Sequence, residues 1–147
     1  MLARADCPVI FVGGGALDAA DEVRALAERL GAPVVSYRRG RGVLDDRHPL
    51  SHALPGGHAL WAKADVVLAV GTRLQLQLAN WGTDDKLALI KVDIDPEELD
   101  RIRTPEIGLA GDAAAVLARL NQHLAHLPAM RADRIARSRD LKERIGA

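Results

Sequence analysis

The chain has 147 residues, enough for one domain, and a domain of this length buries roughly 70% of the surface of its unfolded chain. Lysine plus arginine and aspartate plus glutamate number 20 each, which gives no reason to expect a nucleic acid or an anionic membrane as partner. Cys7 is the only cysteine, which excludes an internal disulfide and a cysteine-based zinc cluster. With no apolar signal-peptide core and no apolar run of about 20 residues, we expect a soluble cytoplasmic protein.

Apolar runs and helical repeats alternate along the chain. Short runs rich in β-branched residues predict buried strands over 8–12, 33–37, 65–70, 87–92 and, more weakly, 106–110. Helical spacing predicts helices over 19–30, from Pro96, and over 112–124, with Gly31 ending the first. The alternation predicts an α/β fold, a Rossmann-like open parallel sheet of five to six strands with helices on both faces.

Two segments depart from this rhythm. Residues 38–58 contain glycines, prolines and histidines with little periodicity, which predicts a long loop lying over a crevice. After Pro128, the arginine-rich run 130–145 predicts either a terminal helix with a solvated face or a linker.

The first glycine-rich loop lies between a predicted strand and a predicted helix. At Gly13, Gly14 and Gly15 the absence of side chains lets backbone N–H groups approach a phosphate. Asp18 stands where a GxGxxG fingerprint has its third glycine, so a tight strand-to-helix turn explains the loop equally well.

Polar side chains follow two later strands. Arg73, after Gly71 and Thr72, could bind a phosphate, hold a carboxylate of the same sheet edge, or be solvated. Asp93 and Asp95 could accept ribose hydroxyls, but Asp95 is better explained as the N-cap of the helix that Pro96 begins. Capping is also the default explanation of Asp112, which follows Gly111.

The predicted loop 38–58 offers cations and histidines. Arg38, Arg39 and Arg41 form a basic cluster suited to a diphosphate or an acidic partner, although Asp45 and Asp46 could neutralise it. Three histidines could suggest a metal site, but no helix aligns them, and we predict no metal site in this chain. They are His48, His52 and His58. No serine or cysteine has the surroundings of a catalytic nucleophile.

In their order and spacing, several motifs resemble the central domain of thiamine-diphosphate-dependent enzymes of the acetolactate synthase type. They are Val12-Gly-Gly-Gly15, Gly40-Arg-Gly42, His48-Pro-Leu50, Ala64-Asp-Val-Val-Leu-Ala-Val-Gly-Thr-Arg73, Val92-Asp-Ile-Asp-Pro96 and Ala110-Gly-Asp112. The resemblance implies a parallel-sheet domain over 1–126, with 127–147 as a helix or linker toward a coenzyme-binding domain. It also implies pyrimidine- and diphosphate-binding domains as partners in the same enzyme, which would be a dimer or tetramer.

In the flavin-containing members that the chain resembles, this domain carries FAD. The matching positions are Gly13, Gly14, Tyr37, Arg38, Arg39, Gly56, Gly57, His58, Gly71, Thr72, Arg73, Asp93, Ile94, Gly111 and Asp112. Two features depart from that group: Leu74-Gln-Leu-Gln-Leu78 replaces an aromatic, acidic and arginine continuation, and Arg38 and Arg39 stand where apolar residues surround the flavin. Other members bind ADP in the same place or bind nothing.

The resemblance also indicates what this chain lacks. The family's catalytic glutamate belongs to another domain, and Gly111-Asp112-Ala113 is not the Gly-Asp-Gly motif that holds Mg²⁺ and thiamine diphosphate. The chain is therefore expected to be non-catalytic alone, within a parent that decarboxylates a 2-oxo acid and passes on the carbanion. Two alternatives remain: a stand-alone adenine-nucleotide-binding regulatory module and, more remotely, an NAD-dependent deacylase-like domain suggested by Gly71-Thr-Arg-Leu74.

Overall fold

The computed structural model, which describes residues 1–128 and 132–146, contains one six-stranded parallel sheet in the order β3-β2-β1-β4-β5-β6. The strands are β1 (Pro8–Val12), β2 (Val34–Ser36), β3 (Ser51–His52), β4 (Val66–Val70), β5 (Ala88–Asp93) and β6 (Ile107–Ala110). Because every pairing is parallel, all six strands end at one edge, called here the carboxyl edge. The open parallel sheet confirms the predicted fold class.

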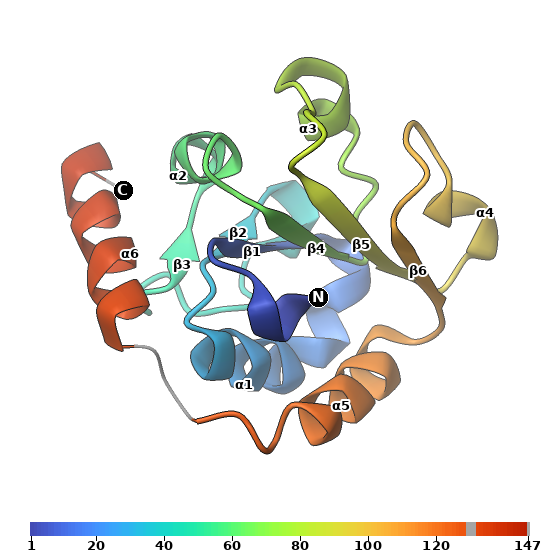
Figure 1. Ribbon diagram of the computed structural model, residues 1–147, viewed down its shortest axis with the longest axis horizontal. Coiled ribbons are helices and arrows are strands. Elements are labelled where there is room, and N and C mark those ends of the chain that lie inside the picture. Colours follow the sequence, from blue (N-terminus) through green and yellow to red (C-terminus); the bar gives the residue numbers. More distant parts are fainter. Residues whose placement is uncertain (129–131, 147) are drawn as a thin grey trace.

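Helices cover both faces of this sheet, with α1 and α5 on one side and α2 and α3 on the other (Figure 1). The α-helices are α1 (Ala20–Leu30), α2 (Leu54–Trp61), α3 (Gln75–Asn80), α4 (Pro96–Leu99), α5 (Ala113–His123) and α6 (Ala132–Ile145). Short 3-10 helices are η1 (Leu2–Arg4), η2 (Gly14–Ala19) and η3 (Arg38–Gly40). Among the described residues no helix is both long and apolar enough to cross a membrane.

The strand pleat divides the hydrophobic core into two clusters. Ile10 and Val12 of β1 point toward α1 and α5, whereas Val9 and Phe11 point toward Trp61 of α2 and the start of α3. All five residues of β1 are buried, as are all five of β4, which explains why these strands are continuous apolar runs.

Most of the predicted elements are confirmed within one or two residues. Helix α1 ends at Gly31, whose left-handed φ of 62° makes it the expected glycine stop. Asp95 and Asp112 cap α4 and α5, accepting hydrogen bonds from the backbone N–H groups of Glu97 and Ala115. The first glycine loop differs from expectation because η2 intervenes before α1 begins.

The prediction of a long loop over 38–58 is wrong. This segment contains η3, β3 and α2, and β3 pairs with β2 through Val34–Ser51 and Val35–His52. Strand β3, with two polar residues, is too short to show the alternation of apolar and polar residues that predicts a strand. Helix α2 contains Pro55, Gly56 and Gly57, residues that local propensity places in loops.

The C-terminal run forms α6, which settles the choice between helix and linker for residues 132–145; Met130 lies outside the described residues. Three polar side chains, four residues apart, attach α6 to backbone carbonyls. Arg134 donates to Leu30 O (2.9 Å) and Ala5 O (2.6 Å), Ser138 donates to Pro49 O, and Lys142 donates to the carbonyls of Asp46 and His48. Helix α6 thus lies beside β3 and α2, at the edge of the sheet (Figure 1).

Candidate site at the carboxyl edge

Glycines bring the loops after β1, β2 and β4 into direct contact. A Cβ added to Gly13 would lie 2.7 Å from Thr72 Cβ, and one added to Gly15 would lie 2.8 Å from Gly71 Cα. A Cβ on Gly40 would lie 2.7 Å from the carbonyl carbon of Val12. No side chain fits at these distances, so close backbone packing accounts for these glycines without a ligand.

The first glycine loop offers fewer free N–H groups than expected. The N–H of Gly13 donates to Val70 O (3.1 Å) and that of Gly15 to Gly71 O (3.2 Å). Of the three glycines, only Gly14 has an N–H without an acceptor among residues 1–128 and 132–146. A phosphate bound at this loop would therefore accept a hydrogen bond from one glycine N–H, and further donors would have to come from side chains.

Arginine side chains supply donors beside Gly14. The side chain of Arg39 lies against Gly14, where an added Cβ would come within 3.2 Å of Arg39 Cβ. Arg38 has a left-handed φ of 50°, its Nε donates to Tyr37 Oη (2.7 Å), and its guanidinium lies 4.9 Å from the Tyr37 ring centroid. Hydrogen bonding and the cation–π contact therefore hold Arg38 through Nε and leave its two Nη groups for a ligand.

One of the two aspartates that could neutralise this cluster, Asp45, is engaged elsewhere. Asp45 forms an ion pair with Arg47 (2.7 Å) and also accepts the backbone N–H of Arg47. That guanidinium and its hydrogen bonds lower the pKa of Asp45. In the part of the chain that the structure describes, no ion pair involves Arg38, Arg39 or Arg41.

Carboxylates gather at the other side of the same edge, after β5 and β6. Asp93 accepts the N–H of Asp95 at Oδ1 (3.0 Å), which leaves Oδ2 without a hydrogen-bond donor among the described residues. Ile94 is 75% exposed beside it. The edge therefore carries arginines after β2 and carboxylates at the ends of β5 and β6.

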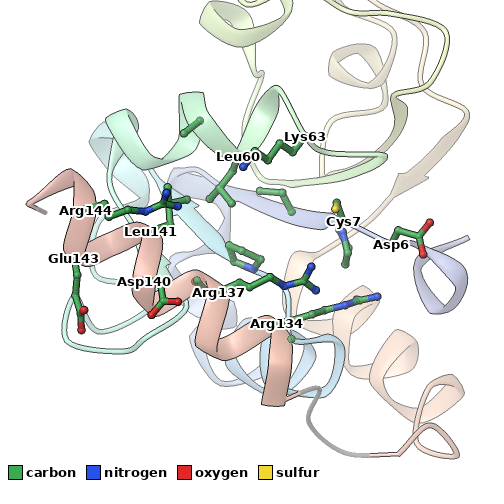
Figure 2. A pocket seen from close by; sticks show the side chains of 16 residues that line it. Asp6, Cys7, Leu60, Lys63, Arg134, Arg137, Asp140, Leu141, Glu143 and Arg144 are labelled. Carbon is green, nitrogen blue, oxygen red and sulfur yellow. The ribbon is translucent and has the colours of Figure 1, made fainter.

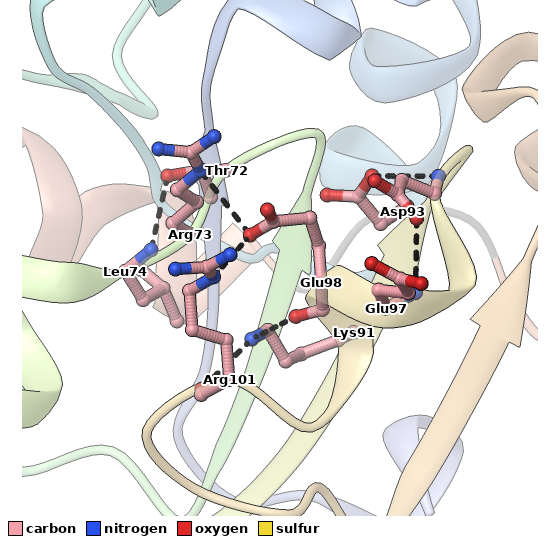
Figure 3. A network of polar contacts seen from close by, with 9 residues as sticks. Thr72, Arg73, Leu74, Lys91, Asp93, Glu97, Glu98 and Arg101 are labelled. Carbon is pink, nitrogen blue, oxygen red and sulfur yellow. Dashed lines mark hydrogen bonds and ion pairs between the residues drawn. The ribbon is translucent and has the colours of Figure 1, made fainter.

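Arg73 belongs to a polar network that the sequence predicted only in part (Figure 3). Its Nε lies 3.2 Å from Glu98 Oε2, and Arg101 Nε lies 2.9 Å from the same oxygen, both as ion pairs without hydrogen-bond alignment. Lys91, 1% exposed, donates to Glu98 O (2.9 Å), and burial lowers its pKa. Sequence reasoning missed Glu98 and Lys91, although a lysine inside the apolar run 87–92 was an available signal.

Two of the sequence-predicted glycines have a packing role within α2. A Cβ on Gly57 would lie 2.5 Å from Val35 Cγ1, and one on Gly56 would lie 2.7 Å from His52 Nδ1. Helix α2 can approach β2 and β3 this closely only because both residues lack side chains. His58 is exposed on α2 and contacts Trp81, with ring centroids 5.0 Å apart.

The three histidines of segment 38–58 do not converge. His48 Nε2 lies 3.1 Å from Glu28 Oε1, His52 Nε2 lies 2.7 Å from Ser138 Oγ, and His58 contacts Trp81. Within residues 1–128 and 132–146 no group of three or more histidine, cysteine, aspartate or glutamate side chains is placed to hold a metal ion.

The sequence-predicted site residues line neither of two cavities found in the described part of the chain. A cavity of about 800 Å³ lies at the opposite edge of the sheet, between α6, α2 and the start of β1 (Figure 2). Cys7, Lys63 and Arg137 are among the residues lining it. A second cavity, of about 370 Å³, lies between α1 and residues 43–48. Most of the predicted residues instead lie at the carboxyl edge, where β1, β2, β4, β5 and β6 end.

Comparisons with known proteins place this chain in a family. A family model described as the central domain of thiamine pyrophosphate enzymes matches residues 1–120. The acetolactate synthase large subunit of Corynebacterium glutamicum is 36% identical over 132 residues, covering 82% of this chain and 21% of that protein. Oxalyl-CoA decarboxylase of Escherichia coli is 36% identical over 138 residues, covering 87% of this chain and 24% of that protein.

An X-ray structure from Mycobacterium smegmatis, described as a thiamin diphosphate-dependent enzyme, shares the fold. It superposes with a TM-score of 0.68 at 20% sequence identity, covering 89% of this chain and 27% of that one. The chain thus spans between a fifth and a quarter of the length of the two curated relatives named above. With six parallel strands and a family match over residues 1–120, the chain belongs to the central domains of thiamine pyrophosphate enzymes.

Proposed function

We propose that this chain is a nucleotide-binding, non-catalytic central domain of a thiamine-diphosphate-dependent enzyme, and that its ligand is FAD or ADP. The observation that carries the proposal is the separation of charge along the carboxyl edge, with unpaired arginines after β2 and carboxylates after β5 and β6. A nucleotide has the matching polarity, because its phosphates are anionic and its ribose hydroxyls donate to carboxylates.

The side chains fit such a ligand. The side chain of Arg39 packs against Gly14, so the N–H of Gly14 and the guanidinium of Arg39 could both donate to a phosphate bound at this loop. Asp93 Oδ2 could accept a ribose hydroxyl, and exposed Ile94 offers an apolar surface to the base. Gly71 and Thr72, after β4, lie between these two ends, and Gly111 and Asp112, after β6, extend the site beyond Asp93.

The parent enzyme, in this proposal, uses thiamine diphosphate and Mg²⁺ bound by other domains of the same protein. It decarboxylates a 2-oxo acid and transfers the resulting carbanion, chemistry that belongs to the coenzyme. Relatives named as an acetolactate synthase and as a decarboxylase support this reaction class. The central domain contributes a structural scaffold and a nucleotide-binding edge. The parent enzyme assembles as a dimer or tetramer.

Thermal unfolding with FAD, ADP, ATP and NAD tests the nucleotide part. A ligand at about 100 times its dissociation constant should add about 2.7 kcal/mol to the free energy of unfolding. Asp93→Asn should weaken the binding of whichever nucleotide stabilises the chain by about tenfold, since a charge-assisted hydrogen bond to the ribose is lost. Asp85→Asn, at an exposed position away from the edge, is the matched control. Stabilisation by none of the four would contradict nucleotide binding and favour a purely architectural domain.

A further inference from the structure

The arginine cluster at the end of β2 carries more positive charge than a diphosphate inside a dinucleotide needs. Arg38, Arg39 and Arg41 all lie within four residues and are exposed. None of them has an ion pair with a described residue, and Asp45 pairs with Arg47. Arg39 lies against Gly14, so the cluster directly adjoins the place proposed for the phosphates.

The backbone and Tyr37 hold one of these cations in a defined place. Arg38 adopts a left-handed conformation, which non-glycine residues adopt rarely because the backbone is strained there. Its guanidinium contacts Tyr37 both through Nε and over the ring, which fixes its plane. A guanidinium fixed in this way presents its two Nη groups as a fork, the geometry that matches the oxygens of a phosphate.

We propose that the ligand of this site ends in a free phosphate at Arg38 and Arg39, so that the chain selects ADP or ATP over the dinucleotides FAD and NAD. This inference rests on the proposed function. A terminal phosphoryl group carries about −1.5 to −2 charge near neutral pH, whereas a phosphate linked on both sides carries about −1. In a dinucleotide the next group past the diphosphate is an uncharged sugar or sugar alcohol bearing a ring, which would desolvate the arginines without pairing them.

The test compares ligands that differ stepwise in phosphate number. Isothermal titration of the chain with adenosine, AMP, ADP, ATP and FAD should give ADP and ATP dissociation constants at least about tenfold below those of AMP and FAD. Arg38→Met and Arg39→Met should each weaken ADP binding by about tenfold and leave adenosine binding unchanged. Both variants should also reduce the dependence of ADP affinity on salt concentration.

Arg119→Met is the matched control, because Arg119 is exposed on α5 and has no ion pair with a described residue. Arg38→Lys separates the effect of charge from that of geometry, because it keeps the positive charge but loses the guanidinium fork and the Tyr37 contact. It should therefore bind ADP less tightly than the unmutated chain. Circular dichroism and thermal unfolding confirm that each variant is folded.

The inference is overturned if FAD binds as tightly as ADP, or if ADP affinity is unchanged in folded Arg38→Met and Arg39→Met. Either of those results leaves the proposed nucleotide function intact, since a nucleotide still binds. Absence of binding by all five ligands overturns the inference and the proposed nucleotide function together.

Discussion

Gly40 has no room for a side chain, because the backbone of Val12 occupies the position of its missing Cβ. Gly40→Ala should therefore force η3 away from β1 and lower the free energy of unfolding by about 2–4 kcal/mol, measured by urea unfolding. Gly108→Ala in β6 is the control, since its Cβ would meet Leu99 Cδ1 at an ordinary 3.4 Å. A Gly40→Ala chain as stable as the parent would contradict the observed contact between the two loops.

His52 is held in one tautomer by its neighbours. Ser138 has a single hydroxyl proton, which it donates to Pro49 O (2.9 Å), so its oxygen accepts the proton of His52 Nε2 (2.7 Å). The remaining nitrogen, Nδ1, is buried without a hydrogen-bond partner in the described residues. A proton on Nδ1 would be buried unpaired, and burial together with nearby Lys142 lowers the pKa of His52 to about 4.

This lowered pKa predicts a pH dependence of stability. Between pH 6.5 and about 4 the unfolded chain binds a proton at His52 that the folded chain excludes, so stability is full above pH 6.5 and falls as the pH decreases. We expect a loss of about 2 kcal/mol by pH 4.5 in urea unfolding. Carboxylates with lowered pKa, Glu28 and Glu106, lose their contribution only below about pH 4.5.

A variant isolates the His52 contribution. His52→Leu should be less stable at pH 7 because it leaves the Ser138 hydroxyl without its donor, but its stability should change less between pH 6.5 and 5. His126→Gln, at an exposed position, should keep the pH dependence of the parent chain. An unchanged slope in His52→Leu would assign the effect to other groups.

At the scale of the element, sequence patterns succeeded where burial is periodic or complete. The strand over 66–70 is a run of apolar residues that is buried throughout, and α1 repeats its apolar residues every three to four positions. Helix α2 could not be predicted, since its glycines are selected by contact with Val35 and His52 rather than by helix propensity. Helix α3 was also not predicted, because the residue before it, Leu74, has a left-handed backbone conformation that no local pattern indicates.

Helix α6 is attached mainly through polar contacts, which makes its attachment sensitive to single side chains. Lys142→Met removes the donor to the carbonyls of Asp46 and His48 and should increase hydrogen exchange in residues 132–146 by several-fold, detected by mass spectrometry. Arg139→Met, exposed on the same helix, should leave exchange unchanged. Equal exchange in both variants would mean that α6 is held without Lys142.

At the scale of the whole molecule, the sequence predicted where strands end but not the contacts between the loops that follow them. Strand ends could be predicted, and in a parallel sheet they all meet at one edge, where Gly13, Arg39, Asp93 and Asp112 lie. The contact of Gly15 with Gly71 depends on a distance that no local pattern contains. The Asp45–Arg47 contact, two residues apart, is local and was missed by sequence reasoning.

The isolated chain is expected to be inactive toward 2-oxo acids. With thiamine diphosphate, Mg²⁺ and pyruvate it should release no CO₂ above a protein-free blank, because in the proposed function other domains bind the coenzyme. Thiamine diphosphate should also leave the melting temperature unchanged under conditions in which a bound nucleotide raises it. CO₂ release that scales with chain concentration would contradict this assignment.

The contact of Gly13 and Gly15 with the loop after β4 has a further consequence for ligand exchange. In many open parallel sheets the loops after two central strands diverge and leave a gap that grips the ligand. Here the loops after β1 and β4 are held together by backbone hydrogen bonds from Gly13 N–H to Val70 O and from Gly15 N–H to Gly71 O. In the proposed function a nucleotide lies across these joined loops rather than between them. Its binding and dissociation would then need no hinge motion within this domain, and its residence time would depend on its own contacts with the edge.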